Sequence, residues 1–347
     1  MKQTVAKLTS RQNIEITQEE PAKLLPGHVR VRIETVGICG SDVYFFESGH
    51  CGPDVLPFPI VLGHECAGTV LETGEGVTHL KAGDLVCLEP GVPCGHCEYC
   101  VQGRYNLCPD VEFMAAPPNY VGCLRETVVH PAHLTFKLPK GMTSVDGAMI
   151  EPLSVGFHAA KQGGAAFGKR VLILGAGCIG LMTLMACKAM GVADITVVDL
   201  FENRLDLALK LGAARVVDAS KRDTAEACRE ALPGGADIVF ETAGSAATTR
   251  QTGGLVKTGG VIVLVGNTHG DVPYDFFEIM NKEITVRCVF RYAGIYPLAL
   301  DAVAKGLIDP AQVITHRFGF DETQQAFMRS VTDKKDIVKG IIEIVAN

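Results

Sequence analysis

The amino-acid sequence predicts a doubly wound α/β domain with a parallel sheet, inserted into a β-rich domain that both ends of the chain build together. In about the first 150 residues, short strand-like runs are punctuated by many turn-forming Pro and Gly residues. From Gly163 onward, short apolar runs alternate with helical periods, which is typical of parallel βαβ units. After about residue 290 this alternation is lost. We therefore expect the β-rich domain at 1–155 and 291–347, and the doubly wound domain at 156–290.

The individual elements follow from the spacing of apolar residues. Residues 28–33 alternate polar and apolar side chains, as a half-buried strand does. In the inserted domain the expected strands are continuously apolar, because such strands are buried on both faces. Between them, apolar residues recur at helical spacing. In chain order we expect a strand at 171–174, a helix at 179–190, a strand at 195–198, a helix at 204–211, and strands at 238–240 and 261–265.

Composition and charge limit the class of protein. The chain has 347 residues, of which 47% are hydrophobic and 20% are charged, as in a soluble globular protein of two domains. A net charge of −7 gives no electrostatic reason to bind nucleic acid or an anionic membrane. Residues 1–13 lack the apolar core of a signal peptide, and the longest nearly apolar run, 180–192, is interrupted by Lys188 and is too short to span a bilayer. We expect a cytoplasmic protein whose thirteen cysteines are metal ligands or core residues rather than disulfides.

A glycine-rich turn opens the inserted domain and predicts a dinucleotide site. Gly175, Gly177 and Gly180 follow the first strand and begin a helix, and Asp199 ends the second strand 24 residues after Gly175. The first glycine would permit the tight turn, the second the approach of the pyrophosphate, and the third close helix–strand packing. Asp199 would accept hydrogen bonds from the adenosine ribose and repel a 2′-phosphate, which favours NAD over NADP. The alternatives are a turn that binds no ligand, and an Asp199 that only caps a helix.

Four cysteines at the spacing C-x2-C-x2-C-x7-C predict a metal site in a lobe at about 90–110. Four thiolates within 15 residues can surround one Zn²⁺ tetrahedrally. An iron–sulfur cluster is the competitor, because bacterial ferredoxins use a related spacing followed by proline, although their final gap is three residues rather than seven. A zinc with four protein thiolates has no open position, so we expect this one to be structural. Its ligands would be Cys94, Cys97, Cys100 and Cys108.

A second set of metal-binding side chains is dispersed along the chain: Cys39, His64, Glu65 and Glu151. Thiolate, imidazole and carboxylate groups suit Zn²⁺, and three protein ligands leave one position for water or substrate. Each of these residues taken singly is more often structural than a ligand. The set alone therefore suggests a catalytic zinc without establishing it.

Several strings, in this order, resemble the zinc-dependent medium-chain alcohol dehydrogenases: GICGSDV, LGHECAG, the four-cysteine segment, IEPLSVG, GAGCIG and VFRY. Over essentially the whole chain, the sequence is most similar to the sorbitol (L-iditol) and related polyol dehydrogenases of that family. The resemblance implies a GroES-like catalytic domain at both ends and a Rossmann domain between them. It also implies NAD, two Zn²⁺ per chain and a homotetramer or homodimer.

The resemblance also assigns roles around the catalytic zinc. It implies that Cys39, His64 and Glu65 bind the metal, and that Glu151 reaches it directly or through water and modulates ligand exchange. The matched residues with a part in proton transfer are Ser41, which would take the proton of the substrate hydroxyl, and Tyr44, which stands where the polyol dehydrogenases have a relay histidine.

The remaining matches concern substrate and cofactor. Phe113 matches an apolar wall of the substrate pocket, Arg291 and Tyr292 match contacts to substrate hydroxyls, and Phe45 replaces a substrate-contacting tyrosine. Tyr44 and Phe45 are departures from the family pattern, so the proton route and the details of polyol preference stay open. The residues matched to the cofactor are Gly175, Gly177, Ile179, Gly180, Asp199, Arg204, Val265, Gly266, Asn267, Val289, Phe290 and Arg291.

Together these observations predict hydride transfer from a secondary hydroxyl of a polyol, such as C2 of sorbitol or xylitol, to NAD, giving a ketose. One alternative is the same chemistry on an aldonate or on threonine. Another is a zinc- and NAD-binding redox sensor without turnover, although the dispersed donor set speaks against it. A zinc-lobe protein that binds nucleic acid conflicts with the acidic charge.

Overall fold

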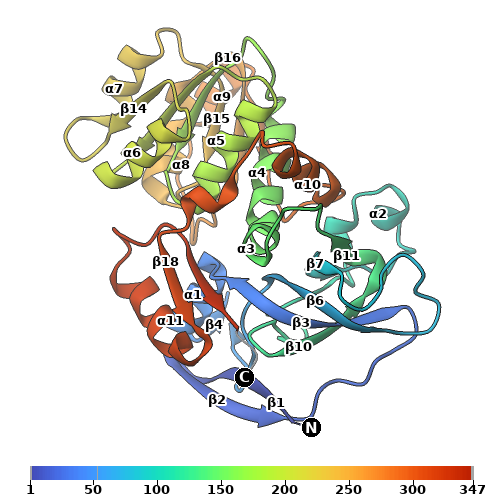
Figure 1. Ribbon diagram of the computed structural model, residues 1–347. Helices are drawn as coiled ribbons and strands as arrows, with labels where there is room; N and C mark the ends of the chain where they lie inside the picture. The colour runs from blue at the N-terminus through green and yellow to red at the C-terminus, as the bar shows by residue number, and fades with distance from the viewer. Residues whose placement is uncertain (1, 53, 345–347) are drawn as a thin grey trace. The chain divides into compact units, whose positions relative to one another are not determined.

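Both ends of the chain fold together, and the middle forms a unit of its own (Figure 1). The computed structural model describes residues 2–52 and 54–344. One unit comprises Met1–Glu151 and Tyr296–Asn347, and the other comprises Pro152–Ile295. These boundaries fall a few residues from the expected 155/156 and 290/291.

Packing explains where the boundaries fall. Helix α4 (Ile150–Gly163) packs closely against the next helix of the middle unit. A Cβ atom added to Gly156 would come 2.6 Å from the backbone of Met182. At the other boundary, the amide of Val289 donates to the carbonyl of Leu264 at 2.9 Å, which keeps the following residues with the middle unit.

A seven-stranded sheet is the centre of the first unit. Its strands run in the order β11-β7-β6-β3-β19-β18, and β10 pairs with β3 off this path. The alternation seen in the sequence is confirmed, because Val29, Val31 and Ile33 are fully buried while the charged side chains between them are partly exposed. The two C-terminal strands join a sheet begun by the N-terminal half. The strands are β3 (His28–Gly37), β6 (Glu65–Thr73), β7 (Leu85–Leu88), β10 (Thr127–Pro131), β11 (Thr135–Lys137), β18 (His316–Gly319) and β19 (Gly340–Glu343).

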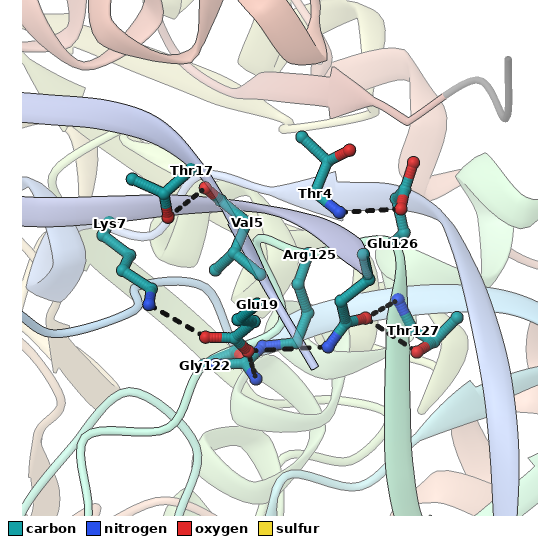
Figure 2. A network of polar contacts seen from close by, with 10 residues as sticks. Thr4, Val5, Lys7, Thr17, Glu19, Gly122, Arg125, Glu126 and Thr127 are labelled. Atoms are coloured by element: carbon teal, nitrogen blue, oxygen red, sulfur yellow. Dashed lines mark hydrogen bonds and ion pairs between the residues drawn. The ribbon is translucent and has the colours of Figure 1, made fainter. Parts of the chain in front are cut away.

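The N-terminal hairpin of β1 (Gln3–Ser10) and β2 (Asn13–Glu19) is tied to the segment before β10 by polar contacts (Figure 2). Arg125 donates from Nη1 to Oε1 of Glu19 at 2.7 Å, and the amide of Thr4 donates to Oε2 of Glu126 at 2.7 Å. Cys123, in the same segment, donates its amide to the carbonyl of Gly63 at 2.9 Å. The hairpin thus braces a segment that in turn holds the residue before His64.

The middle unit is a six-stranded parallel sheet in the order β14-β13-β12-β15-β16-β17. The four strands and two helices expected from the sequence are all present. Strand β16 begins five residues earlier than expected, since Val256 pairs with Ala236 across an irregular register. The elements are β12 (Arg170–Leu174), α5 (Cys178–Ala189), β13 (Asp194–Asp199), α6 (Glu202–Lys210), β14 (Arg215–Asp218), α7 (Thr224–Ala231), β15 (Ala236–Glu241), α8 (Ala246–Leu255), β16 (Val256–Leu264), α9 (Phe276–Asn281) and β17 (Thr285–Cys288).

Helices complete the first unit. Helix α1 (Gly40–Ser48) begins directly after Cys39 and packs on α11 (Thr323–Thr332), with the rings of Phe46 and Phe327 5.4 Å apart. The cysteine-rich lobe contains the short helix α2 (Glu98–Val101). Among the described residues, no helix combines the length and the apolar character needed to cross a membrane.

Glu89 is a carboxyl group buried where strand β7 leads into the cysteine-rich lobe. Its side chain is 2% exposed, and Oε1 accepts a hydrogen bond from the hydroxyl of Tyr105 at 2.6 Å. Burial raises the pKa of Glu89 to about 7, although the Tyr105 hydrogen bond opposes the shift. In the folded protein, Glu89 therefore ionises at a higher pH than it does in the unfolded chain.

This shift predicts a pH-dependent effect of Glu89→Gln. Between about pH 4.5 and 7 the unfolded chain loses the proton of Glu89 and the folded protein keeps it, so the folded state loses stability as the pH rises. The amide side chain of the variant cannot ionise, and its oxygen can still accept from Tyr105. Thermal unfolding should show that the free energy of unfolding of the variant rises relative to that of the wild type from pH 5 to 7.5, by up to about 3 kcal/mol. Above pH 7.5 the difference should stay constant. A difference that stays constant over this range would show that Glu89 does not titrate as described.

Candidate zinc and nucleotide sites

Three of the four dispersed donors meet in the first unit. The sulfur of Cys39, a ring nitrogen of His64 and a carboxylate oxygen of Glu65 all lie within 4.8 Å of one another. Cys39 precedes α1, and His64 and Glu65 stand at the start of β6, opposite the end of β3. One soft thiolate, one imidazole and one carboxylate fit Zn²⁺ and leave a fourth position open. We call this set the three-donor cluster.

Asp42 orients the imidazole of the cluster. Its carboxylate is 1% exposed, with Oδ2 3.3 Å from Nδ1 of His64 and Oδ1 accepting from the amide of Gly63 at 3.3 Å. This contact engages Nδ1 and leaves Nε2 as the atom for a metal. Burial lowers the pKa of His64, but the charges of Asp42 and Cys39 outweigh it and hold that pKa well above 6.5. Asp42 therefore sets both the orientation and the electrostatic environment of this imidazole.

The other predicted residues of this region lie around the cluster. The hydroxyl of Ser41 donates to the sulfur of Cys39 at 3.3 Å. The ring of Phe113 lies 5.4 Å from that of His64, so an apolar wall adjoins the imidazole. Tyr44 and Phe45 follow on α1, with ring centroids 6.4 Å apart and both rings half-buried.

Glu151 is buried at the first turn of α4 but is not one of the three clustered donors. The sequence left open which of the two glutamates is the direct ligand, and the geometry favours Glu65. Glu65 is 1% exposed, and its Oε2 is paired with the ammonium group of Lys339.

The four cysteines of the lobe form a second cluster, with their sulfur atoms within 4.8 Å of one another. The sulfur of Cys97 lies 3.4 Å from that of Cys100, and the amide of Cys94 donates to the sulfur of Cys108 at 3.4 Å. The amides of His96 and Cys97 donate to Cys94 and lower its thiol pKa to about 6, whereas desolvation and the neighbouring thiols raise the pKa of Cys100 to about 12. The donor set fits a closed zinc site without a position for substrate.

The glycine-rich turn of the middle unit has the close contacts that the sequence suggested. Gly175 has φ of 104°, a left-handed conformation that glycine adopts without strain. A Cβ atom on Gly180 would lie 1.9 Å from the carbonyl oxygen of Gly175, so only glycine lets α5 begin this close to β12. At Gly177, the N-cap of α5, the nearest atom to an added Cβ would be Nη1 of Arg204 at 3.9 Å. The turn thus leaves space at Gly177, where a pyrophosphate would approach.

Asp199 is bonded to this turn and does not cap the next helix. Its Oδ2 accepts from the amide of Ala176 at 2.7 Å and its Oδ1 from that of Phe201 at 3.0 Å. The N-cap of α6 is Phe201, so the alternative role as a helix cap is wrong. Arg204 stacks on the ring of Phe201 at 5.1 Å, and its pKa is lowered by burial against the opposing charge of Asp199. These residues therefore surround Gly177 with both a carboxylate and a guanidinium, and Ile179 lies in the first turn of α5.

The strand-end stretch 265–267 packs against the loop after β15. The amides of Val265 and Gly266 both donate to the carbonyl of Glu241, at 2.8 and 2.9 Å. A Cβ atom on Gly266 would lie 2.3 Å from the amide nitrogen of Gly244, and the backbone of Asn267 adjoins Gly244 in the same way. Glu241 itself is fully buried and accepts from the amides of residues 243 and 244.

The end of the middle unit contains residues matched to the cofactor, Val289 and Phe290, and residues matched to the substrate, Arg291 and Tyr292. Arg291 has φ of 54° and its guanidinium lies 4.6 Å from the ring of Phe290, which is 53% exposed. Tyr292 is buried, and Val289 is fixed to the end of β16. These residues belong to Pro152–Ile295, whereas the three-donor cluster belongs to the other unit.

Three residues that contact the candidate site residues were not predicted from the sequence. Asp42 lies next to Ser41 inside the string GICGSDV, so this motif could have indicated that Asp42 belongs to the metal site. Lys339 is 274 positions from Glu65, and only its apolar flanks, Ile337 and Val338 before it and Ile341 after it, hint at burial. Glu241 directly follows the strand predicted at 238–240, a position where an acidic residue is usually on the surface.

Comparison with known proteins identifies the family. Profiles for the "Alcohol dehydrogenase GroES-like domain" and "Zinc-binding dehydrogenase" families match residues 25–140 and 178–305. The "Uncharacterized zinc-type alcohol dehydrogenase-like protein YdjJ" of Escherichia coli is 51% identical over 91% of each chain. This chain belongs to the zinc-dependent medium-chain alcohol dehydrogenases. A sorbitol dehydrogenase of Arabidopsis thaliana is 43% identical to this dehydrogenase, over 88% of this chain and 85% of its own.

Solved structures of relatives agree with this family. An E. coli oxidoreductase/dehydrogenase "of unknown specificity involved in membrane biogenesis" shares 47% identity and a TM-score of 0.97, with both chains fully covered. Two more distant structures, 29% and 27% identical with TM-scores of 0.90 and 0.91, contain NADP and NADH. This dehydrogenase is therefore an oxidoreductase of CH–OH groups with a GroES-like domain, a Rossmann domain, zinc and a nicotinamide cofactor.

The two later glycines of the turn should respond differently to alanine. Gly180→Ala forces a Cβ atom onto the carbonyl of Gly175 and should destabilise the protein by about 2–3 kcal/mol or more. Gly177→Ala meets no atom closer than 3.9 Å, so it should lower the melting temperature far less than Gly180→Ala does, by no more than the small cost of losing a glycine N-cap. The same methyl group would obstruct a pyrophosphate, so NADH affinity should fall by about tenfold or more. Thermal unfolding and NADH fluorescence titration measure both effects, and unchanged NADH affinity in Gly177→Ala would place the pyrophosphate elsewhere.

Proposed function

We propose that this dehydrogenase oxidises a secondary hydroxyl of a polyol to a ketone, with NAD as the acceptor. In this reaction the carbinol C–H bond breaks, and its hydrogen leaves with the electron pair to the nicotinamide ring. The hydroxyl proton passes to solvent, so the products are a ketose, NADH and one proton. The observation that carries the proposal is the three-donor cluster of Cys39, His64 and Glu65, which leaves a coordination position for a hydroxyl oxygen.

The protein's own residues have distinct parts in this proposal. Zinc held by the cluster supplies a Lewis acid that lowers the pKa of a hydroxyl bound to it, and NAD supplies the hydride acceptor. Asp42 holds His64 in one orientation, so the donor geometry is set before a ligand arrives. Ser41, beside the sulfur of Cys39, receives the hydroxyl proton, and Tyr44 extends the route. Glu151 lies outside the cluster and modulates exchange of ligands at the open position.

A polyol is favoured over a simple alcohol by the polar residues matched to the substrate. The resemblance matches a guanidinium, Arg291, and a phenol, Tyr292, to contacts with substrate hydroxyls, and an alkyl alcohol has no further hydroxyls to pair with these groups. The sorbitol dehydrogenase relative supports the same substrate class. An aldonate is the second candidate, because a guanidinium also binds a carboxylate in a bidentate manner, and Phe45 in place of tyrosine keeps this alternative open.

The choice between NAD and NADP rests on two opposing charges. Asp199 would repel a 2′-phosphate, whereas Arg204 could attract one. Because the two carboxylate oxygens of Asp199 accept amides on either side, its charge is fixed in place, and we propose NAD as the cofactor. The homo-oligomer and the cytoplasmic location expected from the sequence stay predictions.

Wild-type enzyme should prefer NAD over NADP by at least about tenfold in kcat/KM, or about 1.4 kcal/mol. Asp199→Ala should lower this NAD-to-NADP ratio mainly by weakening the binding of NAD, because the ribose loses its hydrogen-bond acceptor. Asp194→Ala is a control. Asp194 begins the strand that Asp199 ends, and there it pairs with Arg215 of β14. Equal use of both cofactors by the wild type would contradict the role given to Asp199.

The substrate class is tested by kcat/KM for NADH formation with xylitol, sorbitol, galactonate, threonine and 2-propanol. We expect the polyols to exceed 2-propanol by at least about tenfold, since a buried donor without its partner costs about 1–3 kcal/mol. Arg291→Ala should raise KM for polyols while changing turnover of 2-propanol little. An acid favoured by a hundredfold would overturn the polyol substrate and leave the zinc and nicotinamide chemistry intact.

A further inference from the structure

Lys339 is buried in the first unit, with its ammonium group between the two chain segments that carry metal ligands. The side chain is 2% exposed, and buried lysine occurs almost only where the charge is paired. Its Nζ donates to Oε2 of Glu65 and, at 3.1 Å, to the carbonyl of Ile38. Ile38 directly precedes Cys39. The ammonium group is thus fixed at the edge of the three-donor cluster.

The sheet makes room for this ion pair at Gly37. Strand β3 pairs with β6 on one side, where Gly37 faces Glu65, and with β19 on the other, where Gly37 faces Ile341. A Cβ atom on Gly37 would lie 2.0 Å from Oε2 of Glu65 and 3.1 Å from Cε of Lys339. Any side chain at residue 37 would therefore displace the carboxylate or the lysine.

The backbone of Lys339 is held independently of its side chain. Its carbonyl accepts from the amides of Thr315 and His316, at 2.9 and 3.2 Å. The position of the ammonium group therefore follows from the pairing of β18 with β19 and β19 with β3. The ion pair is part of the sheet's architecture rather than a surface contact.

We propose that Lys339 is a positioning residue that holds one oxygen of Glu65 and leaves the other to bind zinc. This inference rests on the proposed zinc site. An ammonium group in contact with a ligand repels a nearby dication and competes for the carboxylate lone pairs, both more strongly in a buried site than in water. Lys339 therefore keeps Glu65 a one-oxygen ligand and weakens the hold on the metal, so that the coordination sphere can exchange ligands.

The test is the rate at which a chelator removes zinc from the holoenzyme. The phase that belongs to the three-donor cluster is identified as the one missing in Cys39→Ser. Lys339→Met removes the charge at similar length, so Glu65 gains a second oxygen for the metal. We expect that phase to slow by about tenfold or more. Lys339→Arg retains the charge and should retain the wild-type rate.

Lys137→Met is the matched control. Lys137, whose side chain is 55% exposed, pairs with the buried carboxylate of Asp84 at 2.5 Å in the same unit, and neither residue is one of the three clustered donors. This variant should melt at a lower temperature with no change in zinc release, which separates lost stability from a change at the metal. If Lys339→Met does not fold, Lys339→Gln provides the same comparison with a neutral donor.

The possible results distinguish failure of the positioning role of Lys339 from failure of the proposed function. Slower zinc release from the three-donor cluster in Lys339→Met, together with the wild-type rate in Lys339→Arg, supports the positioning role. Zinc release at the wild-type rate or faster in Lys339→Met overturns that role and leaves the proposed function standing. A wild-type enzyme with no zinc phase assignable to Cys39 overturns both.

Discussion

The antiparallel pairing of β3 with β6 is the constraint on which the metal site depends. It places Glu65 opposite Gly37 and sets the end of β3, which runs on into Cys39, beside the start of β6, where His64 and Glu65 stand. A shift by one residue would turn Glu65 to the other face of the sheet. Donors from two distant parts of the sequence meet because one strand register holds.

Buried charge follows from the same arrangement. The carboxylates of Glu65 and Asp42 are both buried beside Cys39, and such groups are costly to bury without compensation. Lys339 offsets part of that negative charge, and a bound dication would offset the rest. The first unit thus contains a specific charged partner for two of the metal-binding side chains, Asp42 for His64 and Lys339 for Glu65.

Local patterns sufficed for much of this structure. The strand alternation at 28–33, the βαβ rhythm and the glycine turn each depend on near neighbours in the chain, and all three are confirmed. The four-cysteine cluster could be predicted for the same reason. Lys339 could not, because its role arises from a strand contributed by the far end of the chain. The hydrogen bond from Ala176 to Asp199 was also beyond prediction, since a strand-end acid can face either the turn or the next helix.

The central claim is that Cys39, His64 and Glu65 hold a zinc ion distinct from the one in the cysteine-rich lobe. Metal analysis of the purified wild type and of Cys39→Ser tests it most directly. We expect two zinc ions per chain in the wild type and one in Cys39→Ser, with circular dichroism showing that the variant stays folded. Equal zinc content in the two proteins, or iron with sulfide in place of zinc, would contradict it.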